Sequence, residues 1–247
     1  MESGASPARQ NHRQHRVSRW RTPAAWMAGL MAGVLLVAFA FTGYFSAKRL
    51  LAEFAAQDPR YHFERWAAGK QKPDAAGISA AFADLRAALA SEPGNPDLYS
   101  DVGRLEYWSV RTAGLADPVA RAGRERALAN FRHAAQLRPT SGHTWGNVAL
   151  TRYTLGLVDR EFAHALKQTL RWAPWQPQLQ LLGIELGLAV WQALDGPTQQ
   201  LISDAIGRQS VWPMHDQKPA LIALLRRYGR TELGCPWAGA ALACPGA

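Results

Sequence analysis

The chain has 247 residues, 48% of them hydrophobic and 19% charged, which is enough apolar material for a folded core and excludes a wholly disordered protein. Its two cysteines are too few for a disulfide-dense mini-protein or a thiolate zinc site. The formal net charge of +9 would suit nucleic-acid binding, but residues 1–49 hold seven bases against one acid, and the rest of the chain holds 21 against 18. The basic excess is local, so we expect no nucleic-acid partner.

The N-terminal region predicts a basic tail followed by one membrane anchor. Residues 1–21 lack apolar periodicity and are expected to be a disordered cytoplasmic tail. Residues 22–47 carry no charge, and about 20 apolar residues are enough to cross the hydrocarbon core of a bilayer. Five arginines precede this segment and two bases, Lys48 and Arg49, follow it. The positive-inside rule therefore predicts a single-pass membrane protein with a cytoplasmic N-terminus. In a bacterium this would be an inner-membrane protein with a periplasmic C-terminal domain.

Two features of the anchor leave alternatives open. Ala38, Phe39 and Ala40 have the small-x-small form of a signal-peptide cleavage site, although the apolar run continues beyond them. Gly29 and Gly33 lie four residues apart on one helix face, a spacing that lets two helix backbones approach closely in a homodimer. Glycine is also common in membrane helices that do not associate.

A repeated spacing of residues follows the anchor, in a region with almost no strand signal. Two sets of residues share steps of four, three and five positions: Ala81, Leu85, Ala88 and Pro93, then Ala127, Phe131, Ala134 and Pro139. Such steps place two alanines and one large residue on one helix face, and the proline helps to end the helix. A second helix is expected after each proline, over Asn95–Trp108 and Gly142–Tyr153, and Pro174 closes a weaker third copy.

This pattern resembles tetratricopeptide (TPR) repeats, helix–turn–helix units of about 34 residues. The three prolines are 46 and 35 residues apart, so the first interval holds an insertion of about 12 residues, placed over Val110–Ala122. The resemblance covers about residues 60–194 and implies an all-α fold, with a TPR-like helical repeat stack over residues 48–194. The alternative is a generic helical bundle with coincident spacing.

Residues 195–247 are expected to form a helical cap and a cysteine-containing tail. Amphipathic patterns predict helices over Thr198–Gln209 and Lys218–Tyr228, and a repeat stack needs terminal units with a polar outer face. Cys235 and Cys244 flank a short Gly- and Pro-containing segment. A disulfide between them can persist on the extracytoplasmic side of the membrane, with free thiols as the alternative.

The sequence contains no catalytic constellation. It has no Gly-rich phosphate loop, no His-Glu-x-x-His pair and no Gly-x-Ser-x-Gly elbow, and its histidines are scattered. We therefore expect no enzyme activity, no catalytic residue, no cofactor and no metal site.

The TPR resemblance implies instead a concave groove lined by the first helix of each pair. The matching positions in this chain are Asp97, Ser100, Arg104, Tyr107, Trp108, His143, Leu150 and Tyr153. Aromatic residues combined with arginine are typical of protein-contact hot spots, and they also suit stacking on sugar rings. The alternative is that Tyr107, Trp108 and Tyr153 fill the core between helices.

The layout as a whole, together with residues 188–213, is similar to the VpsP-like family of bacterial exopolysaccharide biosynthesis proteins. The resemblance implies a scaffold or adaptor that binds protein partners of an envelope complex, in exopolysaccharide biosynthesis or export. Two alternatives remain: an assembly or chaperone-like module for a pilus, secretion or cytochrome-maturation system, and a carbohydrate-acting enzyme whose site the sequence does not reveal.

Overall fold

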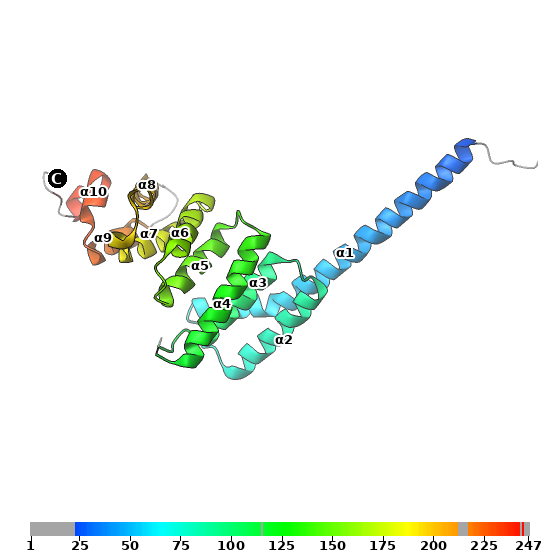
Figure 1. The fold of residues 1–247 in the computed structure, drawn as a ribbon, viewed down its shortest axis with the longest axis horizontal. Helices are drawn as coiled ribbons and strands as arrows, with labels where there is room; N and C mark the ends of the chain where they lie inside the picture. The colour runs from blue at the N-terminus through cyan, green and yellow to red at the C-terminus, as the bar shows by residue number, and fades with distance from the viewer. Residues whose placement is uncertain (1–22, 115, 212–216, 243, 245–247) are drawn as a thin grey trace, which may run out of the picture. The chain divides into compact units, whose positions relative to one another are not determined.

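The computed structural model describes residues 23–114, 116–211, 217–242 and 244, which form helices joined by turns and loops, with no strand (Figure 1). The chain divides into two compact units, Met1–Ala47 and Lys48–Ala247, and helix α1 (Pro23–Ala67) begins in the first and ends in the second. The all-α prediction is confirmed for the described residues. The tail predicted over residues 1–21 lies outside them.

Helix α1 is long and apolar enough to span a membrane. Its most apolar window of 18 residues has a mean hydropathy of 1.9, and no residue of that window is buried. Large apolar side chains such as Leu36 and Phe39 are 70% and 79% exposed, which is costly in water and favourable in hydrocarbon. Gly29 and Gly33 lie on this exposed surface, where an added Cβ atom would meet no other atom within 4 Å.

The helix does not end at residue 47, where the apolar run stops, but continues to Ala67. Beyond residue 47 the helix buries a single face, with Ala52, Ala56, Phe63 and Trp66 at most 4% exposed. These side chains share a core with residues of the next two helices, including Leu85, Leu98 and Leu105. After the uncharged segment ends at residue 47, burial of one amphipathic face therefore stabilises the rest of the helix.

The next seven helices run as α2 (Ala75–Ser91), α3 (Pro96–Ser109), α4 (Pro118–Leu137), α5 (Gly142–Thr154), α6 (Arg160–Trp172), α7 (Pro177–Ala189) and α8 (Gly196–Val211). From α2 to α8 each helix packs against the next. Helix α5 also contacts α7, and α6 contacts α8, so odd-numbered and even-numbered helices form separate layers in this region (Figure 1).

The predicted Ala/large/Ala faces form the interior of this array. Ala81, Leu85 and Ala88 are at most 2% exposed, and so are the corresponding residues of α4. Where α3 crosses α4, a Cβ atom added to Gly103 would lie 2.6 Å from the Phe131 ring. The backbone of α3 therefore rests directly on that ring, a contact that a larger residue would prevent.

The turns that precede α3 and α5 are closed by equivalent side chains. The Tyr99 hydroxyl donates to the Pro93 carbonyl at 3.1 Å, and the Trp145 indole donates to the Pro139 carbonyl at 2.8 Å. Both aromatic residues lie six positions after the proline, so the same proline–aromatic turn occurs before α3 and before α5. This turn orients each of these helices relative to the helix that precedes it.

The insertion predicted at Val110–Ala122 lies only partly in a turn. Helix α4 begins at Pro118 and runs for 20 residues, so the part of the insertion from Pro118 to Ala122 is helical. The turn is held by Arg124, 6% exposed, which donates to the Ala113 carbonyl at 2.7 Å. Proline at the first helical position and the Asp117 side chain, which accepts from Val119 N, explain the early helix start.

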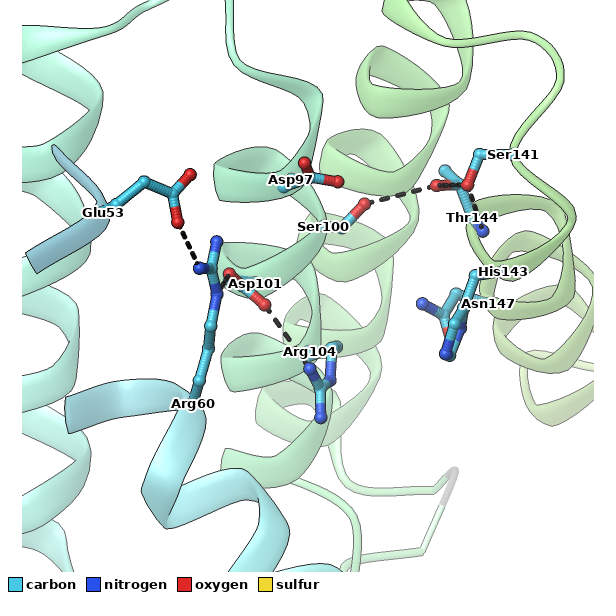
Figure 2. A pocket seen from close by; sticks show the side chains of 10 residues that line it. All are labelled: Glu53, Arg60, Asp97, Ser100, Asp101, Arg104, Ser141, His143, Thr144 and Asn147. Carbon is cyan, nitrogen blue, oxygen red and sulfur yellow. Dashed lines mark hydrogen bonds and ion pairs between the residues drawn. The ribbon is translucent and has the colours of Figure 1, made fainter. Parts of the chain in front are cut away.

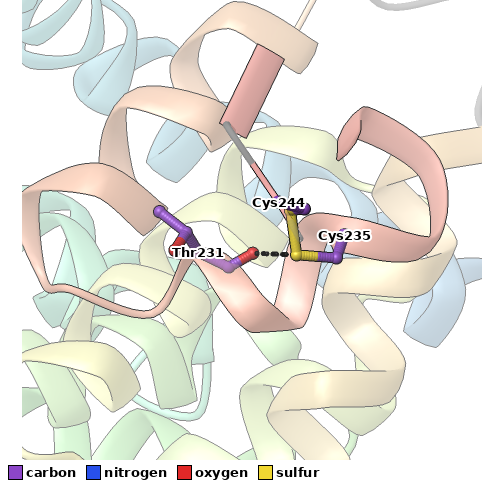
Figure 3. The surroundings of a disulfide bond; sticks show 3 residues. All are labelled: Thr231, Cys235 and Cys244. Carbon is purple, nitrogen blue, oxygen red and sulfur yellow. Dashed lines mark hydrogen bonds between the residues drawn. A yellow bond between two sulfur atoms is a disulfide. The ribbon is translucent and has the colours of Figure 1, made fainter. Parts of the chain in front are cut away.

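The C-terminal region contains α9 (Lys218–Arg227), which matches the helix predicted over Lys218–Tyr228. A short 3-10 turn (Thr231–Gly234) and α10 (Cys235–Leu242) follow it, and these two were not predicted. Cys235 and Cys244 are joined by a disulfide with Cα atoms 5.7 Å apart, and Cys235 Sγ lies 3.4 Å from the Thr231 carbonyl oxygen (Figure 3). Leu242, inside the closed loop, is 5% exposed and belongs to the main core. The disulfide therefore ties the end of the chain to the packed helices.

Replacing Gly103 with alanine is expected to lower the free energy of unfolding by about 1–3 kcal/mol, because the new methyl group overlaps the Phe131 ring. Chemical denaturation of the full chain in detergent measures this change. Gly94→Ala is the matched control, since a Cβ atom there meets nothing within 4 Å. Equal stability of the two variants would contradict the close α3–α4 contact.

Replacing Cys235 and Cys244 together with serine is expected to lower stability by roughly 2–3 kcal/mol, because the unfolded chain regains the entropy of an open loop. Denaturation with and without reductant measures the effect in the wild type, and the double variant should not respond to reductant. Two reactive thiols in the unreduced, unfolded wild-type protein would show that the disulfide is not formed.

Candidate functional site

A polar cavity of about 270 Å³ lies between α1, α3 and α5 within the second unit (Figure 2). Its lining comes from these odd-numbered helices and the residue that caps α5: Glu53, Arg60, Asp97, Ser100, Asp101, Arg104, Ser141, His143, Thr144 and Asn147. The cavity thus lies on one layer of the array and opens on the face that those helices share.

The wall of the cavity is a chain of alternating charges that crosses from α1 to α3. Asp101 is 4% exposed and accepts from Arg60 Nε at 2.6 Å and from Arg104 Nη1 at 3.4 Å. Arg60 Nη1 donates in turn to Glu53 Oε2 at 2.6 Å. Each of these carboxylates is therefore bound by at least one guanidinium, which compensates for its removal from water.

Burial changes the proton affinities in this chain of charges. It raises the pKa of Asp101, although the charge of Arg60 opposes the change. Burial also lowers the pKa of Arg104, with Asp101 opposing. The Arg104 guanidinium lies 4.5 Å from the centre of the Phe63 ring, so an aromatic face supports it where water does not.

A second set of polar groups links α3 to α5. Thr144 Oγ1 lies 3.4 Å from Ser100 Oγ and 2.9 Å from Ser141 Oγ, and Figure 2 shows His143 and Asn147 on the side of α5 that faces α3. His143 reaches the surface, yet reduced hydration lowers its pKa, and the positive charge of Arg104 lowers it further. Both effects favour the neutral imidazole.

An aromatic cavity of about 420 Å³ adjoins the polar one. It is lined by Ala67, Arg104, Tyr107, Trp108, Arg111, Phe131, Asn147, Leu150 and Thr151. Arg104 and Asn147 line both cavities, so the two lie side by side, and together we call them the α1/α3/α5 groove. The Arg111 guanidinium lies 4.4 Å from the centre of the Trp108 ring, so this end of the groove pairs aromatic and cationic surface.

The structure brings together seven of the eight residues predicted to line a groove. The polar cavity contains Asp97, Ser100, Arg104 and His143, and the aromatic one contains Arg104, Tyr107, Trp108 and Leu150. Tyr153 lines neither cavity, because it lies roughly 120° around the helix from Asn147. Tyr107 and Trp108 are half-buried and, besides lining the aromatic cavity, pack against the core.

Sequence reasoning missed six residues of the polar cavity: Glu53, Arg60, Asp101, Ser141, Thr144 and Asn147. Asp101 and Asn147 carry a usable signal, since each lies four positions from a predicted residue on the same helix. Glu53 and Arg60 carry none, because only the fold places the end of α1 beside α3.

No group of three or more His, Cys, Asp or Glu side chains among the described residues is arranged to hold a metal ion. Comparison with known protein families, curated proteins and solved structures finds no match to this chain. A role for the protein therefore has to be inferred from the groove and the sequence.

Replacing Asp101 with asparagine is expected to destabilise the fold by about 2–3 kcal/mol, because Arg60 and Arg104 lose the buried carboxylate between them. Thermal or chemical denaturation measures the loss. Glu125→Gln is the matched control: its pair with Arg121 is more than half exposed, and its removal is expected to cost under about 0.5 kcal/mol. A loss no larger than that of the control would show that Asp101 is not a structural link.

His143 is expected to titrate below the ordinary histidine value of about 6.5. Desolvation disfavours its charged form, so it takes up a proton only at more acidic pH than a free imidazole. NMR of histidine-labelled protein measures this pKa directly. Replacing Arg104 with glutamine removes a repelling charge and should move the pKa upward, whereas an unchanged value would show that Arg104 does not act on His143.

Proposed function

We propose that this chain is a single-pass bacterial inner-membrane protein whose periplasmic, TPR-like domain binds a protein partner in the α1/α3/α5 groove. The observation that carries the proposal is the groove itself, which is polar at one end, aromatic at the other, and lined mainly by alternate helices. Stacks of helix pairs commonly offer such a surface for binding.

The contacts between helices support a repeat-stack interpretation. Successive helices pack together, α5 contacts α7 and α6 contacts α8, as expected when each helix pair stacks on the next. The repeated proline–aromatic turns and buried Ala/large/Ala faces point to the same unit used at least twice. In this interpretation the end of α1 serves as the first helix of the first pair, with α2 as the second.

The chemistry of the groove favours a polypeptide ligand and a binding role. Glu53 and Asp101, which could otherwise act as acid or base, are held in ion pairs with arginine. The hydroxyl groups near Thr144 and the Asn147 amide offer hydrogen bonds to backbone groups of an extended partner. The aromatic end, with Tyr107 and Trp108, offers the type of surface that contributes most to protein interfaces.

Three features support the placement in the envelope. The apolar part of α1 can span a membrane, and the arginines before it favour a cytoplasmic N-terminus. The disulfide at the C-terminus is of a kind that persists in oxidising compartments such as the periplasm. Together with the resemblance to VpsP-like proteins, these features lead us to propose a scaffold or adaptor in exopolysaccharide biosynthesis or export.

A photo-crosslinking residue at position 147 tests the groove in living cells. Asn147 is half-exposed and belongs to both cavities, so a bound partner should be captured there. A crosslinker at Ala129, an exposed position on α4, is the control and should capture nothing specific. The captured proteins, identified by mass spectrometry, should be components of polysaccharide synthesis or export.

The variant Asn147→Arg is expected to abolish co-purification of the captured partner, because the long side chain fills the junction of the two cavities. Ala129→Arg should leave co-purification unchanged. Absence of any specific adduct at position 147 would contradict a protein-binding groove. Capture of pilus, secretion or cytochrome-maturation components would instead favour a role in one of those systems.

A further inference from the structure

A third cavity, of about 410 Å³, lies on the even-numbered helices α6 and α8 and shares no residue with the α1/α3/α5 groove. It is lined by His164, Lys167, Gln168, Leu170, Arg171, Pro174, Leu201 and Arg208. The lining thus combines a small apolar base with three cationic side chains, those of Lys167, Arg171 and Arg208, and contains no carboxylate.

The positive charge of this cavity is only partly neutralised. Lys167 Nζ lies 3.1 Å from Asp195 Oδ2, a half-exposed carboxylate outside the lining. Arg171 and Arg208 have no carboxylate partner among the residues that the structure describes. Counted over the described residues, two positive charges therefore remain in excess around the cavity.

Arg208 is held in place by a fully buried amide. Gln180 is 0% exposed, and its Nε2 donates to the Leu170 and Ala173 carbonyls at 3.1 and 2.9 Å. These two bonds orient Gln180 Oε1, which accepts from Arg208 Nη2 at 3.2 Å. The buried Gln180 side chain thus positions the Arg208 guanidinium at the cavity.

The Nε atom of Arg208 is buried and has no acceptor within the described residues. An unsatisfied donor of a charged group is expensive to bury, and no described residue supplies an acceptor for this one. On the α6 side of the cavity, the Arg171 guanidinium lies 5.3 Å from the centre of the Trp172 ring, and the Trp172 indole donates to Gln168 Oε1 at 2.6 Å. These contacts hold the α6 side chains in place.

We propose that the α6/α8 cavity is a binding site for a dianionic phosphate group. A phosphate monoester carries close to two negative charges at neutral pH, which matches the two excess positive charges, whereas a single carboxylate would leave one of them unmatched. Arginine forks suit the oxygen geometry of phosphate, and the Lys167 ammonium supplies a third donor group. This site is independent of the partner-binding groove.

Isothermal titration of the full chain in a non-ionic detergent with inorganic phosphate tests the proposal. We expect one phosphate per chain, with affinity falling about tenfold or more in Arg171→Ala and in Arg208→Ala, because each loses a charge-assisted hydrogen bond. Arg121→Ala, an exposed arginine on α4, is the matched control and should bind as the wild type does.

Because Arg208 is half-buried, its variant is checked by thermal unfolding, and Arg171→Ala, at an exposed position, supplies a second result that does not depend on folding. Phosphate should raise the Tm of the wild type and of Arg121→Ala but not of Arg171→Ala. Absence of binding at millimolar phosphate, equal binding by Arg171→Ala, or equally tight binding of acetate would overturn the proposal.

Two phosphate sources are separated by comparing glycerol 3-phosphate, a monoester, with glycerophosphoglycerol, a diester like a lipid headgroup. Tighter binding of the monoester is the expected result and identifies a free phosphorylated ligand. Tighter binding of the diester would contradict the proposal of a dianionic ligand and would indicate a site for a lipid headgroup instead.

Discussion

The buried ion pair between Arg60 and Asp101 is the contact on which the groove depends. It joins α1 to α3 along the wall of the polar cavity, and Asp101 also holds Arg104, which both cavities share. A carboxylate this deeply buried is stable only while its guanidinium partners remain in place. The position of α1 and the charge pattern of the groove are therefore set by the same interaction.

The array of helices separates two kinds of surface. The odd-numbered helices α1, α3 and α5 supply most of the groove, in which acids and bases neutralise one another and aromatic residues line one end. The even-numbered helices α6 and α8 supply the other cavity, in which positive charges exceed negative ones. Close helix contacts at small residues, such as Gly103 of α3 against Phe131 of α4, hold odd-numbered helices against even-numbered ones. One domain can thus offer a neutral surface suited to a polypeptide and a separate site suited to an anion.

Much of the local structure follows from particular residues. Alanines and large residues at steps of four and three predict the buried faces of α2 and α4, because a helix repeats every 3.6 residues. The TPR resemblance gave the positions expected to line a groove, and seven of those eight residues line the two cavities, whereas Tyr153 lies on a different side of α5. The continuation of α1 to Ala67 was not predicted, since its burial depends on α2 and α3 rather than on its own composition.

The sequence by itself determined the helical character of the chain, the apolar segment, the prolines that end helices and the residue types on each helix face. These properties depend on neighbours within one or two turns, so spacing alone reveals them. Only the tertiary structure decided that Arg60 meets Asp101, and that Gln180 holds Arg208 beside Lys167 and Arg171. Those two hydrogen bonds join residues 41 and 28 positions apart, and helix packing, which no local pattern encodes, brings them together.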